Sequence, residues 1–194
     1  TDNRTCLAAG QTVRGDAARV TRLFSGVLAA AAVAIDAAPV KGVLKLPVSA
    51  LRVASIALRK PANRNLAISL TPEQFRYGFG NALPPEESAD LYDRWTVPSP
   101  ARPLFQAALA NFTPRSPAKV NTGNKTRGPL LLTAGGQDHT VPAAITTSTR
   151  KLYHKSPAIT DFIEFPDRGH SLTIDHGRRE VAQAVLDWLS RRSL

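Results

Sequence analysis

Two side chains with acid–base chemistry, Asp138 and His170, each follow an apolar run and a glycine. Gly135 and Gly136 permit a tight turn before Asp138, and Gly169 lets the chain bend directly before His170. A carboxylate that accepts a hydrogen bond from one imidazole nitrogen fixes the tautomer, so that the other nitrogen can take up a proton. This pattern predicts that Asp138 orients His170 as a general base. The alternative is that each residue only stabilises its own loop.

The apolar runs before these residues have the length and composition of strands. Strands are expected within residues 27–35, 129–134 and 160–165, and helices at about 142–153 and 178–190. Strands that alternate with helices form neighbouring parallel strands, because the crossover between them is right-handed. The carboxyl ends of parallel strands meet at one edge of the sheet, which is where functional side chains gather. We therefore expect Asp138 and His170 to lie close together at that edge.

Residues 41–118 have a different character, with many prolines between short helical patterns. Thr71-Pro72-Glu73 places a capping residue, a proline and an acid in the order of a helix start, and a second helix is expected after Pro84-Pro85. The segment is therefore predicted to be an all-helical insertion. Its aromatic side chains are expected to form its own core rather than to line a cavity. They are Phe75, Tyr77, Phe79, Tyr92, Trp95, Phe105 and Phe112.

With these features the sequence resembles the α/β-hydrolase family. The similarity lies in Gly-Gly-Gln-Asp-His-Thr-Val-Pro at 135–142, Asp-Arg-Gly-His-Ser-Leu at 167–172 and the closing amphipathic helix. The resemblance implies that Asp138 is the acid after the seventh strand and His170 the histidine after the eighth. It implies an α/β fold, a partial α/β-hydrolase-like parallel sheet with an all-helical cap insertion. The core would comprise residues 20–40 and 119–194, the cap residues 41–118, and residues 1–19 a poorly structured lead-in.

One part of the family pattern is missing from the sequence. Members carry a serine nucleophile in a Gly-x-Ser-x-Gly turn, which would lie upstream of residue 20, and no such pentapeptide occurs in this chain. The chain also contains no methionine, so its numbering is expected to start inside a longer or processed protein. The first hypothesis is a hydrolase of ester-type or other small lipophilic substrates, with an Asp-His-assisted serine if a nucleophile is supplied. The second is a truncated, catalytically silent relative that acts as a binding or interaction module.

Two other residues have a functional alternative that the sequence leaves open. Asp36 closes the first expected strand and could replace Asp138 as the acid, although a role in the turn before Pro39 is favoured. Ser25 lies near the position of the missing nucleophile, but a serine at the end of a helix is the favoured interpretation.

A metal site is the remaining alternative for the histidine loop. No His-x-Glu motif and no pair of histidines at helical spacing occurs in the sequence, so neither a metal nor a cofactor is expected. The residues that such a site would use are Asp138, His139, His170, Asp175 and His176.

Composition limits the remaining classes of function. The single cysteine, Cys6, excludes an internal disulfide. The formal charge of +10 favours acidic partners, but the basic residues occur in short doublets, which argues against nucleic-acid binding. No apolar run reaches the ~20 residues of a membrane span, so a soluble, cytoplasmic protein is expected. A small-molecule substrate is what the resemblance to the α/β-hydrolases implies. A three-stranded parallel sheet with poor cover would also favour self-association.

Overall fold

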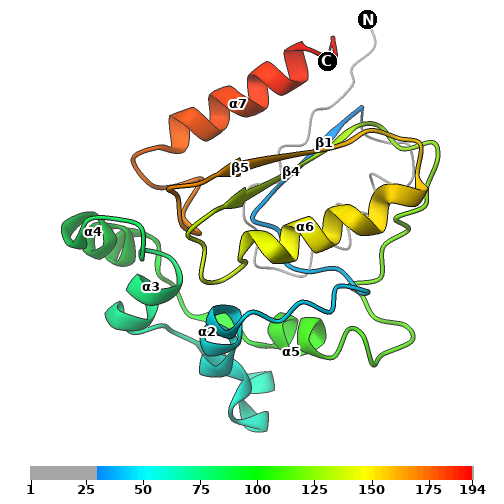
Figure 1. Cartoon of the computed structure of the whole chain (residues 1–194). Helices are drawn as coiled ribbons and strands as arrows, with labels where there is room; N and C mark the ends of the chain where they lie inside the picture. The colour runs from blue at the N-terminus through cyan, green and yellow to red at the C-terminus, as the bar shows by residue number, and fades with distance from the viewer. Residues whose placement is uncertain (1–29, 194) are drawn as a thin grey trace, which may run out of the picture.

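The computed structural model describes residues 30–193, and a three-stranded parallel sheet lies at its centre (Figure 1). The strands β1 (Ala32–Ile35), β4 (Leu130–Gly135) and β5 (Thr160–Phe165) are arranged in the order β1-β4-β5. The pairing advances from Ala32 with Leu130 to Ile35 with Thr133, and the pairs of β4 with β5 advance in the same way. All three strands therefore run in the same direction. The expected α/β class and the parallel sheet are confirmed.

The central strand β4 is buried along its whole length because helices cover both faces of the sheet. All six residues of β4 are buried. The helices α6 (Ala143–Leu152) and α7 (Arg178–Ser190) lie on opposite faces (Figure 1). Strands that are covered on both sides must be apolar on both sides, which explains why Leu-Leu-Leu stands in β4 without polar alternation.

A separate apolar cluster lies on each face of the sheet. On the α6 side, Leu130 and Leu132 pack against Tyr153, which belongs to the 3-10 helix η2 (Tyr153–Lys155). On the α7 side, Leu172 packs with Phe165 of β5 and Val181 of α7. Leu131 and Leu172 are completely inaccessible to solvent, and burial of one such side chain contributes about 1.5–3 kcal/mol. The contacts of Phe165 and Leu172 fix the end of β5, from which the loop with His170 begins.

The chain between β1 and β4 forms a group of short helices on the α6 side of the sheet (Figure 1). Apart from the loops, its regular elements are helices, with the two-residue antiparallel pair of β2 with β3 as the exception. Its elements are α2 (Val48–Leu58), η1 (Pro61–Asn65), β2 (Ala67–Ile68), α3 (Pro72–Gly78), α4 (Pro85–Trp95), β3 (Ser99–Pro100) and α5 (Arg102–Ala108).

The helix α3 begins as the sequence predicts. Thr71 Oγ1 accepts a hydrogen bond from the backbone N–H of Gln74, and Gln74 Oε1 accepts one from the N–H of Thr71, which is a complete capping box. Phe75 of α3 packs with Leu83 and with Leu91 of α4 in a small core of their own. Part of the aromatic set therefore forms the core of this segment.

The helices within residues 30–193 lack the combination of length and apolar character that a membrane crossing needs. The expected lead-in, residues 1–19, lies outside the described residues.

Candidate active site

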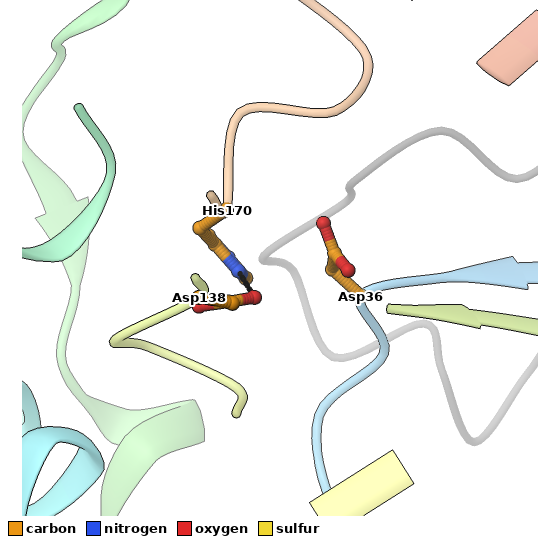
Figure 2. A group of neighbouring side chains, drawn as sticks. All are labelled: Asp36, Asp138 and His170. Carbon is orange, nitrogen blue, oxygen red and sulfur yellow. Dashed lines mark hydrogen bonds and ion pairs between the residues drawn. The ribbon is translucent and has the colours of Figure 1, made fainter. Parts of the chain in front are cut away.

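Asp138 and His170 lie side by side at the carboxyl edge of the sheet (Figure 2). His170 Nδ1 is 2.7 Å from Asp138 Oδ2, and both side chains are buried. A carboxylate oxygen accepts, so Nδ1 carries the proton and Nε2 keeps a lone pair. The loops after β4 and β5 thus bring together the two residues that the sequence singled out.

The Asp138 carboxylate is held in place by three hydrogen bonds. Besides the bond to His170, Oδ1 accepts from the backbone N–H of Thr140 at 2.6 Å and of Val141 at 2.8 Å. An aspartate that accepts from the N–H groups two and three residues later is a common turn arrangement. The turn therefore aims Oδ2 at the histidine and leaves the side chain little freedom to rotate.

The glycines before Asp138 allow the two loops to approach closely. A Cβ at Gly135 would lie 2.5 Å from the carbonyl oxygens of Arg168 and Gly169, and one at Gly136 would lie 2.5 Å from that of Pro166. Real Cβ atoms do not come this close to backbone, so the double glycine is needed for contact between the loops. The two glycines thus serve both the tight turn that the sequence predicts and the close approach of the loops.

The surroundings of His170 favour its protonated form. Burial alone lowers the pKa of an imidazole, but the hydrogen bond to Asp138 and the charge of Asp138 outweigh it, with a smaller contribution from Asp36 when that carboxyl is ionised, so the pKa of His170 is raised above its ordinary value. Phe79 meets the imidazole edge to face, with ring centroids 4.9 Å apart. The histidine is thus a strengthened base with an aromatic ring on one side.

Polar contacts pin the histidine loop on both sides of His170. The Arg168 guanidinium forms a buried ion pair with Asp175. Ser171 Oγ donates to the carbonyl of Phe79 at 2.9 Å, and His176 forms hydrogen bonds to Glu87 of α4 through its backbone N–H and Nδ1. These interactions hold the loop against both the sheet and the helical segment.

The carboxyl end of α3 is attached to the aspartate loop in the same way. His139 Nδ1 donates to the carbonyl of Tyr77 at 2.9 Å, and Thr140 Oγ1 donates to that of Gly78 at 2.7 Å. His139, Asp175 and His176 therefore have other partners, and they do not form the metal set considered from the sequence.

Asp36 joins the pair instead (Figure 2). It follows β1 directly, is 4% exposed and has a φ of 45°, which is unusual for a residue other than glycine. One potential ligand atom from each of Asp36, Asp138 and His170 lies within 4.8 Å of the others. The sequence shows an acid directly after a strand of the same sheet. The favoured prediction, a role in the turn before Pro39, did not place Asp36 beside Asp138 and His170.

The Asp36 carboxyl is poorly solvated. Oδ1 accepts from the N–H of Gly135 at 3.2 Å, whereas Oδ2 is buried with no hydrogen-bond partner among residues 30–193. Burial, opposed by His170 and assisted by the negative charge of Asp138, raises the pKa of Asp36 to about 8.

The group offers one imidazole and two carboxylates, which is a donor set that a divalent ion could use. Asp138 already accepts three hydrogen bonds, however, and one of them joins it to His170. An acid–histidine pair therefore fits these contacts better than a metal centre.

The described residues contain no serine in a nucleophile turn. Ser171, next to His170, is 1% exposed, and its hydroxyl donates to a carbonyl. Ser25, the other serine considered, lies outside residues 30–193.

The chain is similar in structure to several enzymes. They include a putative non-heme bromoperoxidase from Mycobacterium tuberculosis H37Rv (TM-score 0.59, 15% identity, 90% of this chain and 63% of that one). A 2-hydroxy-6-oxo-6-phenylhexa-2,4-dienoate hydrolase from Rhodococcus sp. strain RHA1 gives a TM-score of 0.56 at 12% identity, with coverage of 92% and 62%. Polyneuridine aldehyde esterase gives 0.54 at 14% identity, with coverage of 87% and 66%. The chain thus spans less than two thirds of the length of each.

No curated protein matches the sequence. The model of the dienelactone hydrolase family, in contrast, matches residues 96–192, which is half of the chain and includes the loops of Asp138 and His170. The parallel α/β fold of the chain is consistent with this match. The chain belongs to the dienelactone hydrolase family of the α/β-hydrolases.

Proposed function

We propose that this chain carries the acid–base half of a hydrolase active site for small ester-type substrates. The observation that supports it most strongly is the buried hydrogen bond of 2.7 Å between His170 Nδ1 and Asp138 Oδ2. It sets the tautomer and raises the basicity of His170, and in this proposal Nε2 is the atom that exchanges a proton with a reacting group. The family and the similar enzymes support hydrolysis as the type of reaction.

In this proposal His170 transfers one proton in each half of the reaction, first from the serine and then from water. Nε2 takes the proton of a serine hydroxyl as that oxygen bonds to the ester carbonyl carbon, and gives it to the alcohol oxygen when the carbon–oxygen bond breaks. Water then reacts with the acyl-serine in the same way, which releases the acid and restores the serine. Asp138 keeps its negative charge throughout and stabilises the imidazolium. The serine itself is not assigned within residues 30–193.

Hydrolysis of a short-chain nitrophenyl ester by the purified protein tests this proposal. His170→Ala and Asp138→Asn are expected to lower kcat/KM by about 10³–10⁴-fold, because each removes the oriented base. His154→Ala is the matched control, since His154 is exposed on η2 and its Nδ1 is bonded to the carbonyl of Lys151 in its own turn. Hydrolysis that is unchanged in His170→Ala would contradict the proposal.

A fluorophosphonate label, located by mass spectrometry, identifies the nucleophile. Labelling of one serine in the wild type, and weak labelling in His170→Ala, would support a serine mechanism.

The absence of a Gly-x-Ser-x-Gly motif supports a second candidate, a catalytically silent binding module. In that case neither hydrolysis nor label is observed, and His170→Ala changes only ligand binding. The two candidates thus give different results in the same pair of experiments.

A further inference from the structure

The positive charge of this protein is concentrated in two stretches of the chain. Residues 37–72 and 96–137 contain eleven Lys and Arg and no Asp or Glu. The rest of the chain holds the other fourteen basic residues and all 15 acidic ones, so it is nearly neutral. The acids that border the two stretches include Asp36 and Asp138, which are buried. The net charge of +10 therefore comes from these two stretches of the sequence.

The two stretches lie against each other in the fold. The helices α2 and α5 contact one another, and both contact η1, on the side away from α7 (Figure 1). Lys41 Nζ donates to the carbonyl of Thr113 at 2.6 Å, and the N–H of Gly42 donates to Asn111 Oδ1 at 2.7 Å. We call residues 41–66 and 102–119 the basic apolar surface.

The same region carries most of the exposed apolar side chains. Of the twelve large apolar residues that are exposed among residues 30–193, nine lie in the two acid-free stretches. Three of them are nearly free of contacts, with exposed fractions of 79% for Leu44, 81% for Val48 and 84% for Phe112. The others are Leu46, Leu51, Leu66, Val97, Leu104 and Leu109. Such a density of exposed apolar groups typically marks an interaction site.

A shallow hollow combines both properties. It has a volume of about 180 Å³. Its lining includes Arg64 of η1, Phe105 of α5 and Leu109 in the turn after α5. A cation beside apolar walls suits a ligand with an anionic head and an apolar body.

We propose that the basic apolar surface docks on a bilayer that contains anionic lipids. Basic side chains attract the headgroups, while the exposed leucines, Val48 and Phe112 insert at the boundary with the acyl chains. A nucleic acid would use the charge but would leave this apolar surface exposed to water. The proposal is independent of catalysis.

Co-sedimentation of the whole chain with vesicles tests the proposal. We expect binding to phosphatidylcholine vesicles with about 30 mol% phosphatidylserine, no binding to pure phosphatidylcholine, and release at about 0.5 M NaCl, because salt screens the attraction. The variant Lys45→Glu/Arg59→Glu/Lys60→Glu is expected to weaken binding by more than about tenfold. Its matched control, Lys151→Glu/Lys155→Glu/Arg179→Glu, changes the net charge equally but lies outside the surface, and a less than twofold effect is expected.

A second variant separates a lipid from other anions. Leu44→Ser/Leu46→Ser/Val48→Ser keeps every charge and is expected to lose about tenfold in affinity for anionic vesicles, because apolar insertion is removed. Circular dichroism and the unfolding midpoint check that each variant is folded.

Three results would overturn the proposal. They are the absence of binding to anionic vesicles, an equal loss in the control variant, and full binding by the serine variant together with displacement by duplex DNA. The last result would identify a site for polyanions rather than for lipid.

Discussion

Two buried aspartates lie at the same edge of the sheet, but they accept different numbers of hydrogen bonds. Asp138 receives two backbone N–H groups and the His170 imidazole. Asp36 receives one N–H, from Gly135, and its second oxygen has no partner among residues 30–193. Ionised carboxylates in protein interiors need donors, so burial raises the pKa of the poorly solvated Asp36 to about 8, and Asp36 keeps its proton at neutral pH. With its proton, Asp36 places no second negative charge beside the pair of Asp138 and His170.

Asp36 is expected to make the folded protein less stable as the pH rises. Its pKa is about 8 in the folded chain and near 3.8 when the chain is unfolded, so between these values the folded state binds one proton more. The free energy of unfolding then falls from about pH 4 to about pH 8 and is constant above. Asp36→Asn removes this titration and keeps an oxygen for Gly135, so the variant gains stability relative to wild type on going from low to high pH.

Urea unfolding of both proteins at about pH 5 and about pH 9 measures the effect. Since the raised pKa of His170 also gives stability that is lost as the pH rises, only the difference between the two proteins reports on Asp36. If the free energies of unfolding of wild type and Asp36→Asn differ by the same amount at both pH values, Asp36 is already ionised at the lower pH.

The sequence predicted helices and strands correctly where hydrophobic periodicity or capping chemistry was strong. The apolar run of β4, the spacing in α7 and the Thr71 cap each correspond to an observed element. The pair of β2 with β3 has only two residues in each strand, which is too short for a periodic pattern. The position of Phe79 beside His170 depends on how α3 meets two distant loops, and local sequence contains no signal for such a contact.

The close approach of the two site loops predicts a specific effect of a small side chain. Gly135→Ala would place a methyl group 2.5 Å from two carbonyl oxygens of the histidine loop, so the loops must separate. We expect a loss of about 1–3 kcal/mol in the free energy of unfolding, typical of an overpacked interior. We also expect impaired hydrolysis, because the distance between Asp138 and His170 depends on this contact.

Gly123→Ala is the matched control for this substitution. A methyl group there would meet only Asn121 Oδ1, at 3.8 Å, and a change within about 0.5 kcal/mol is expected. Denaturant unfolding of the three proteins provides the comparison. Equal stabilities of Gly135→Ala and Gly123→Ala would mean that the loops move apart at little cost.

The sheet is covered on both faces, whereas its edge strands β1 and β5 each pair with β4 alone among residues 30–193. Helices α6 and α7 lie on opposite faces (Figure 1). Within residues 30–193, however, β1 pairs only with β4, and all four of its side chains are half-buried. An unpaired edge exposes a row of N–H and C=O groups that can pair with another chain.

This edge predicts concentration-dependent self-association through β1. The N–H of Ala32 donates to Pro129 and that of Asp36 to Thr133, so by alternation the N–H of Val33 points to the outer edge. Val33→Pro removes that donor, and proline is tolerated on edge strands, so the variant should associate less while its circular dichroism stays close to wild type. Light scattering coupled to size exclusion, at about 5 µM and about 100 µM, measures the mass of both proteins. A wild type that stays monomeric at both concentrations would show that the outer edge of β1 is already protected, and an associated Val33→Pro would assign the contact to another surface.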